Sequence, residues 1–195
     1  MDTTIKTIKA RTGDALYRIR IIYDDIAESP RKLYDNVGII NCFHKRYDIG
    51  DRHDHRDDDF DDMGEFGRHL AEEHGAIHLC PVILTVHSAT NLCIGTKMDS
   101  GCVGWIYATR GRYAEIYGEE WADLPEQRER LDRSFCAETT DMDDYMNGAV
   151  YAYVIEKLNV WDGEWVNEES CHGHYGEFTE EEATQFLNEY IGKVA

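Results

Sequence analysis

The chain has 195 residues and a formal net charge of −19, from 39 Asp/Glu and 20 Lys/Arg. This excess of carboxylates disfavours direct binding to DNA or RNA, because their phosphates carry the same sign of charge. Hydrophobic residues make up 42% of the chain, which is enough to form a core and argues against disorder. No apolar run approaches the length of a membrane span, and the first residues lack the apolar core of a signal peptide. We therefore expect a cytoplasmic protein with no membrane partner.

Short runs of β-branched and aromatic residues predict strands, and apolar residues three or four positions apart predict helices. Thr179 and Glu182 have the spacing of a capping box at the start of the last helix. Asp162-Gly163 predicts a type I′ turn between the last two strands. In chain order we expect strands at residues 16–26 and 37–44, a helix at 63–74, strands at 76–87, 91–95 and 102–108, a helical turn at 110–117, a helix at 123–146, strands at 149–156 and 160–166, and a helix at 180–191.

These elements predict an α+β fold, with a mixed, largely antiparallel sheet and about three helices packed on it. A doubly wound sheet is disfavoured because strands and helices do not alternate regularly. No Pro/Gly/Ser-rich linker divides the chain, so we expect a single domain over residues 1–195 with an acidic loop at 51–62. The six cysteines are widely spaced, lie mostly in apolar runs and form no CxxC motif, which predicts buried thiols without disulfides and no structural zinc site of the usual kind.

The negative charge is unevenly distributed along the sequence. Residues 1–50 contain nine Lys/Arg and seven Asp/Glu, whereas residues 51–195 contain eleven and thirty-two. Concentrated carboxylates repel one another, so we expect them on exposed elements that serve solubility, cation binding or recognition of a basic partner. The candidate partner-binding residues lie in the acidic loop and on the long helix: Asp54, Asp57, Asp58, Asp59, Asp61, Asp62, Glu126, Glu129, Asp141, Asp143 and Asp144.

One segment of the acidic loop, residues 53–58, nearly matches the HxHxDH motif of metallo-β-lactamase-fold hydrolases, in which His and Asp bind metal ions. Asp58 stands in place of the last histidine of the motif. A looser metal site formed by His53, His55 and nearby carboxylates is one alternative, and a solvated loop without metal is the other. The run of aspartates lacks the Gly and Glu of an EF-hand, so we expect no cofactor beyond weak binding of a divalent cation. A metal-dependent enzyme would draw its ligands from His44, Asp51, His53, His87 and His174.

Cys171 and His172 stand side by side near the end of the chain. Such a pair can supply a thiolate nucleophile or metal ligands. Catalysis by Cys171 would need the fold to bring an imidazole such as His44 or His87 near its thiol. The alternative, which we favour, is a structural loop with a buried thiol.

Three segments resemble, in the same order, a set of small proteins encoded by phages and mobile elements that have no assigned activity. A His-Ser pair lies between the first two segments of that family, and His87-Ser88 is similar, although Val86 replaces the acidic residue that often precedes it. The resemblance implies a mobile-element origin and an accessory role in the host cytosol, and it implies no reaction. The segments are residues 35–51 with FHKRYDIGD, residues 99–107 with DSGCVGWIY, and residues 150–176 with VYAY and CHGHYG.

Charge and resemblance together favour a phage protein that acts as a stoichiometric inhibitor of a basic host protein. Such a partner would be a nucleic-acid-binding defence factor of a restriction or CRISPR system, and the carboxylates would act as a DNA mimic where that partner expects phosphates. A metal-dependent hydrolase is the alternative. A structural role in which the charge only provides solubility is the third possibility.

Overall fold

The computed structural model describes residues 4–95 and 101–194, and its contacts divide the chain into two compact units. Unit 1 comprises residues 1–28 and 148–195, and unit 2 comprises residues 29–147. The chain leaves unit 1 after two strands and returns to it for two further strands and the last helix. The sequence analysis expected a single domain and gave no sign of this division, because neither crossing has the composition of a linker.

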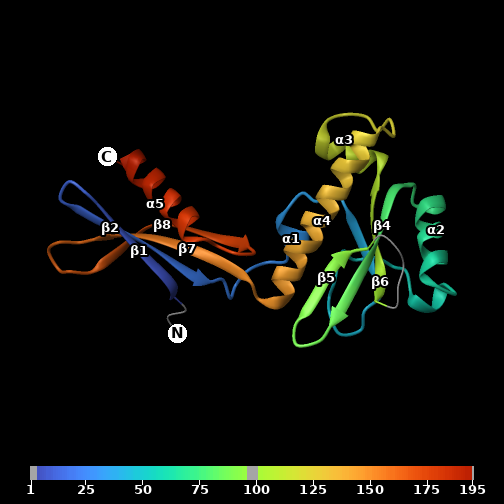
Figure 1. Cartoon of the computed structure of the whole chain (residues 1–195), viewed down its shortest axis with the longest axis horizontal. Coiled ribbons are helices and arrows are strands. Elements are labelled where there is room, and N and C mark those ends of the chain that lie inside the picture. The colour runs from blue at the N-terminus through green and yellow to red at the C-terminus, as the bar shows by residue number, and fades with distance from the viewer. Residues whose placement is uncertain (1–3, 96–100, 195) are drawn as a thin grey trace. The chain divides into compact units, whose positions relative to one another are not determined.

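Unit 1 is a four-stranded antiparallel sheet with one helix packed on it (Figure 1). The strand order is β1-β2-β7-β8. Along β2, Tyr17, Ile19 and Ile21 alternate with arginines, and these apolar side chains pack with Leu187 of α5. The elements are β1 Thr4–Thr12, β2 Ala15–Tyr23, β7 Val150–Leu158, β8 Trp165–Tyr175 and α5 Glu180–Val194.

The other face of this sheet is held by an ion pair network. Glu156 on β7 is 7% exposed and accepts hydrogen bonds from Nε of Arg18 at 2.6 Å and Nε of Arg20 at 2.9 Å. The Arg18 guanidinium also lies over the ring of Trp165, 4.2 Å from its centroid. Burial alone would raise the pKa of Glu156, but the two arginines outweigh burial and lower it.

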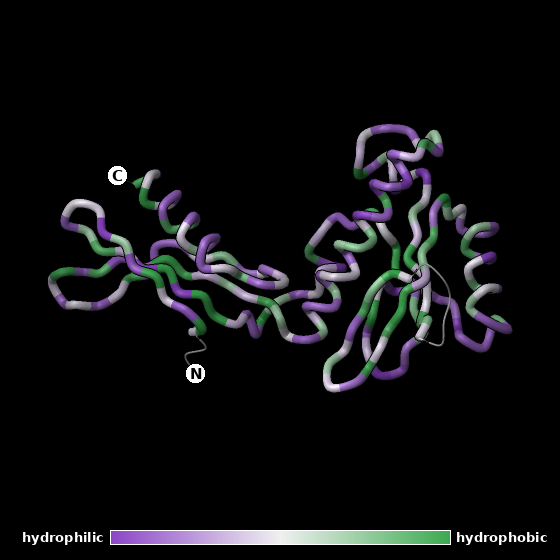
Figure 2. Tube along the Cα trace, in the orientation of Figure 1, coloured by the Kyte–Doolittle hydropathy of each residue, from purple (hydrophilic) through white to green (hydrophobic). Residues whose placement is uncertain are grey.

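Unit 2 contains a second antiparallel sheet, with the strand order β3-β6-β4-β5 and helices on both faces. Along β6, Trp105 and Tyr107 pack with α2, whereas Ile106 and Ala108 pack with α4. Apolar residues colour much of these strands green in Figure 2, and the segment that leads into α2 is mostly purple. The elements are α1 Pro30–Leu33, β3 Ile39–Cys42, the 3₁₀ turn η1 Asp57–Asp59, α2 Met63–Glu73, β4 Ala76–Val86, β5 Thr90–Ile94, β6 Cys102–Thr109, α3 Arg110–Tyr117 and α4 Pro125–Asn147.

The α+β class is confirmed, but the described strands form two antiparallel sheets instead of one, and five α-helices stand where about three were expected. Among the residues described, no helix has an apolar stretch long enough to cross a lipid bilayer. The six cysteines all lie in the described ranges and form no disulfide, but they are not buried as expected: Cys93, Cys136 and Cys171 are exposed, and the other three are half-buried. Asp99 and Ser100, part of the second resembling segment, lie outside the described residues.

Local signals at the end of the chain were partly right. The capping box is confirmed, because Glu182 Oε2 accepts a hydrogen bond from Thr179 N at 2.8 Å and Thr179 Oγ1 accepts one from Glu182 N at 3.2 Å. The strand expected over residues 160–164 is wrong. These residues form a loop wider than a two-residue turn, closed by a 2.8 Å hydrogen bond from Asn159 N to Glu164 O.

Candidate functional site

The predicted partner-binding carboxylates do not form one surface. The acidic loop leads into α2, which packs on one face of the sheet of unit 2, whereas α4 packs on the opposite face. Glu126 and Glu129 are exposed on α4. Asp141 and Asp144 are half-buried, and burial, together with a neighbouring carboxylate, raises the pKa of each. The loop and the helix are therefore two separate acidic surfaces.

Several of these carboxylates stabilise the fold. Asp62 caps α2 by accepting a hydrogen bond from Glu65 N at 2.8 Å, and Asp59 accepts one from Arg56 N at 3.0 Å. Asp143 accepts a 2.7 Å hydrogen bond from the backbone of β5. Four loop carboxylates remain exposed and, across residues 4–95 and 101–194, accept no hydrogen bond and form no ion pair: Asp54, Asp57, Asp58 and Asp61.

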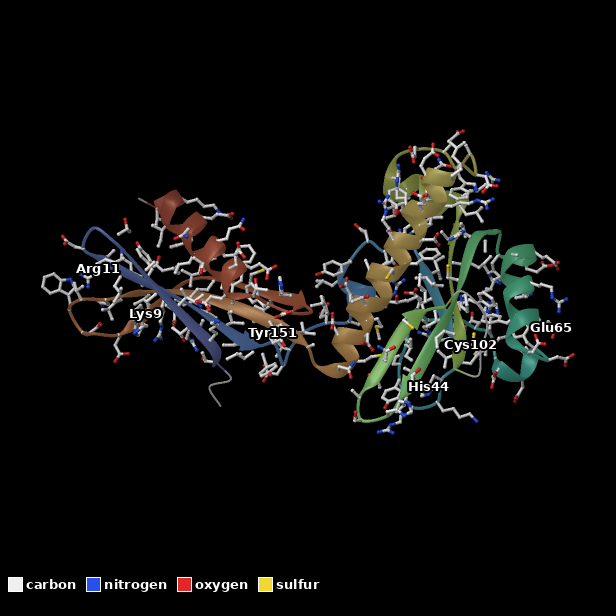
Figure 3. All side chains as sticks on the ribbon, viewed as in Figure 1. Lys9, Arg11, His44, Glu65, Cys102 and Tyr151 are labelled. Atoms are coloured by element: carbon white, nitrogen blue, oxygen red, sulfur yellow. The ribbon has the colours of Figure 1, made fainter. Side chains whose placement is uncertain are left out.

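Four of the five predicted metal ligands lie in unit 2 and, among the residues described, do not assemble into one site there. His174 belongs to unit 1, and the other four belong to unit 2. Within unit 2, His87 is exposed in the turn after β4. His44, labelled in Figure 3, uses Nδ1 to accept a 3.1 Å hydrogen bond from Tyr47 N and so stabilises its own turn.

Asp51 fixes the beginning of the acidic loop and is a structural residue. Its Oδ2 accepts hydrogen bonds from Arg31 Nη2 at 2.7 Å and from Ile40 N at 2.8 Å. The Arg31 side chain is 4% exposed and also binds Glu138 of α4, at 2.7 Å. The loop therefore starts from a buried ion pair network.

A histidine cluster lies beside this loop. His55 comes from the loop, His69 from α2, and His74 is the C-cap of that helix. One imidazole nitrogen of each lies within 4.8 Å of the corresponding nitrogens of the other two. His55 was named as a candidate ligand from the sequence, whereas His69 and His74 were not. The available signal was that four of the nine histidines fall within residues 53–74.

The position of His55 is set by contacts on both sides of it in the chain. Before it, His53 Nε2 lies 3.1 Å from the backbone oxygen of Cys42. After it, η1 fixes the backbone. The ring of His55 packs against Phe66 of α2, with 5.4 Å between centroids. His55 is therefore held in place although its imidazole makes no hydrogen bond to any residue that the structure describes.

The cluster borders an open pocket of about 490 Å³ whose lining is mostly polar. Glu65, on the outer side of α2, is one of its carboxylates (Figure 3). Burial lowers the pKa of His55, and the neighbouring imidazoles add to this effect. The neutral imidazole, which is the form that binds metals, is thereby favoured. The pocket is lined by His55, Asp59, Phe60, Glu65, Arg68, His69, Glu72 and Glu73.

A second group of possible metal ligands lies where β4 meets α4. His78 Nε2 and Asp132 Oδ1 are 2.7 Å apart, and Cys80 Sγ is 3.9 Å from that nitrogen. Asp132 and Cys80 both contact Nε2 of His78. In a nucleophilic Cys-His-Asp triad the thiol and the carboxylate contact opposite ring nitrogens, so this group is not such a triad. Burial raises the pKa of Cys80 to about 12, with a further contribution from Asp132. The group is explained as a His–Asp pair beside a protonated thiol.

Cys171 and His172 lie on β8 of unit 1 and not in the loop that was expected. His172 Nδ1 is 3.2 Å from Oδ1 of the buried Asp24, whose Oδ2 accepts a hydrogen bond from Gly173 N at 2.8 Å. The Cys171 thiol points to the backbone oxygen of His172 at 3.7 Å. His172 therefore fastens a strand to Asp24 and does not activate the thiol.

No protein-family model matches the chain, and searches among curated proteins and among solved structures found no match. The resemblance to phage and mobile-element proteins stays a prediction from the sequence.

Proposed function

We propose that this protein is an acidic interaction module that binds a basic partner through the loop at residues 54–61. The observation that best supports it is the set of four exposed carboxylates, Asp54, Asp57, Asp58 and Asp61, that have no hydrogen-bond or ion-pair partner in the described part of the chain. Four unpaired carboxylates within eight residues repel one another. A basic partner relieves that repulsion.

The surroundings of the loop strengthen its negative field. Residues 51–74 contain ten Asp/Glu and three Lys/Arg. Such a field accelerates the encounter with a positively charged surface, and the acceleration declines as salt screens it. Proteins that bind nucleic acids present positively charged surfaces. A host defence protein that binds DNA or RNA is therefore the proposed partner. The acidic residues of α4 are not part of the proposed surface, because α4 packs on the opposite face of the sheet.

The test compares two sets of charge-neutralising substitutions in the full chain. Partners captured from host lysate are identified, purified and titrated against wild type, against the quadruple variant D54N/D57N/D58N/D61N, and against E126Q/E129Q. We expect the loop variant to bind about tenfold or more weakly, the α4 variant to bind as wild type does, and duplex DNA to compete with the protein. Equal binding by the loop variant, or a partner that DNA does not displace, would contradict the proposal.

A metal-dependent hydrolase is a second candidate, because His55, His69 and His74 converge beside the pocket. Three histidines with an open fourth position can activate a metal-bound water. The carboxylates around this position disfavour anionic substrates such as phosphate esters. Hydrolysis of a neutral ester such as p-nitrophenyl acetate in the presence of Zn²⁺, compared between wild type and H69Q, tests this candidate. Equal rates in the two proteins would exclude it.

A further inference from the structure

We propose that His55, His69 and His74 form a binding site for one transition-metal ion of the Zn²⁺ class. This inference goes beyond the acidic interaction surface and does not depend on it. The three donor nitrogens already lie within 4.8 Å of one another. Tetrahedral zinc with Zn–N distances of about 2.0–2.1 Å places such nitrogens about 3.3 Å apart. The distances between these nitrogens therefore exceed the spacing in a zinc site by at most about 1.5 Å, a difference that side-chain rotation can close.

The three imidazoles are available as ligands. None of them makes a hydrogen bond within the described ranges, whereas His44, His78 and His172 do. Their ring centroids are 4.8 to 5.2 Å apart, so protonated rings would repel one another. A metal ion bound between the neutral rings would instead be coordinated by all three nitrogens.

A fourth histidine supplies an independent sign of a ligand at this place. His53 Nε2 faces the carbonyl oxygen of Cys42, which can only accept, so Nε2 carries the proton and Nδ1 has the lone pair. This Nδ1 is buried and has no hydrogen-bond partner among the residues that the structure describes. An unsatisfied buried acceptor destabilises the folded state. The His53 ring lies 5.5 Å from that of His55, so a donor in the coordination shell of the metal would satisfy it.

The chemistry of the donors and of the pocket sets the kind of metal. Imidazole nitrogens favour Zn²⁺, Co²⁺, Ni²⁺ and Cu²⁺ over Mg²⁺ and Ca²⁺, which prefer oxygen. Carboxylates from Asp59, Glu65, Glu72 and Glu73 line the same pocket and offset the charge of the ion. His74 is exposed and the pocket is open, so the ion can exchange with solvent and keep a position for an external ligand.

The test is titration of the metal-free full chain with Zn²⁺ by calorimetry and with Co²⁺ by visible absorption. We expect one ion per chain, a Co²⁺ spectrum of tetrahedral type, and a rise in Tm on adding Zn²⁺. H69Q and H74Q should each weaken binding by about 100-fold or more, because even residues outside the coordination shell are worth about 10–100-fold. H87Q removes an exposed histidine outside the cluster and should bind as wild type does. His74 is exposed, so H74Q keeps the test valid even if H69Q folds poorly.

Three results would overturn the site. The first is equal Zn²⁺ affinity in H69Q, H74Q and H87Q. The second is displacement of Zn²⁺ by Ca²⁺ at comparable concentration, which would indicate carboxylate ligands. The third is loss of binding in D132N with wild-type binding in H74Q, which would move the ion to the group formed by His78, Cys80 and Asp132.

Discussion

The indole Nε1 of Trp105 donates a hydrogen bond of 2.8 Å to the backbone oxygen of Met63. It joins β6 to the first residue of α2. One turn later, Gly67 lies so close to the indole that a Cβ at this position would be 2.8 Å from its ring atoms. These two contacts hold α2 against the sheet, and they therefore determine where His69 lies.

Replacing Trp105 with Phe should loosen this attachment. W105F keeps an aromatic ring but removes the indole N–H that donates to the Met63 carbonyl, so we expect a loss of about 1 kcal/mol in the free energy of unfolding by urea. W161F is the matched control, because Trp161 is 94% exposed. If the two variants are equally stable, the hydrogen bond does not hold α2.

Removing the Arg31 side chain should have a larger effect. Arg31 is buried between Asp51 and Glu138, and R31M leaves both carboxylates without their cation. Breaking a buried pair in this way costs about 3–5 kcal/mol, which chemical denaturation will measure. R128Q breaks the exposed pair between Arg128 and Asp123, and it should lower the free energy of unfolding far less than R31M does, because solvent screens the pair. A loss of similar size in both variants would contradict a structural role for Asp51.

Elements with strong local signals could be predicted from the sequence. The predicted bounds of the strand at 102–108 and of the last helix, which follows Thr179, agree with the structure within a few residues. Both predictions rest on a β-branched run or a capping box, which are interactions between residues close in the sequence. The first strand, β1, was missed because Lys, Thr and Arg separate its few apolar residues, Ile5, Ile8 and Ala10, so it contains no apolar run. The existence of two sheets could not be predicted, because pairing of β2 with β7 joins residues more than a hundred positions apart.

The candidate site was predictable only in part for the same reason. The acidic loop is a local feature of composition, and its exposure was expected. The convergence of His55 with His69 and His74 depends on where α2 packs, which Trp105 and Gly67 determine from a distant strand. The sequence left open whether the acidic residues of the loop and of α4 form one surface. The alternation of side chains along β6 places the two elements on opposite faces of the sheet.

Two aspartates of the loop should differ sharply in their effect on stability. Asp62 caps α2, whereas Asp58 is exposed and has no hydrogen-bond or ion-pair partner among the residues described. We expect D62A to lose about 1 kcal/mol in urea unfolding, and D58A to be neutral or slightly stabilising because it relieves repulsion. A destabilised D58A would show that its carboxylate serves the fold, and it would weaken the case for a binding role.

Glu156 makes the stability of unit 1 depend on pH. Its pKa is lowered in the folded state because the hydrogen bonds from Arg18 and Arg20 outweigh burial. The unfolded chain therefore binds a proton more readily than the folded chain does. The contribution of Glu156 is fully present above its unfolded pKa of about 4.3 and is lost as pH falls through the folded value.

Replacing Glu156 with Gln should remove this contribution. At pH 7, E156Q should lose about 2 kcal/mol in the free energy of unfolding, the scale of hydrogen bonds to a charged group. Between pH 7 and pH 3 the variant should lose less stability than wild type, because the titrating carboxylate is gone. E177Q is the matched control, since Glu177 is exposed and forms no ion pair in the described part of unit 1. The measurement is the urea midpoint of wild type and E156Q as a function of pH across this range. We expect the two curves to converge toward acid pH. Parallel curves would mean that Glu156 does not couple folding to proton binding.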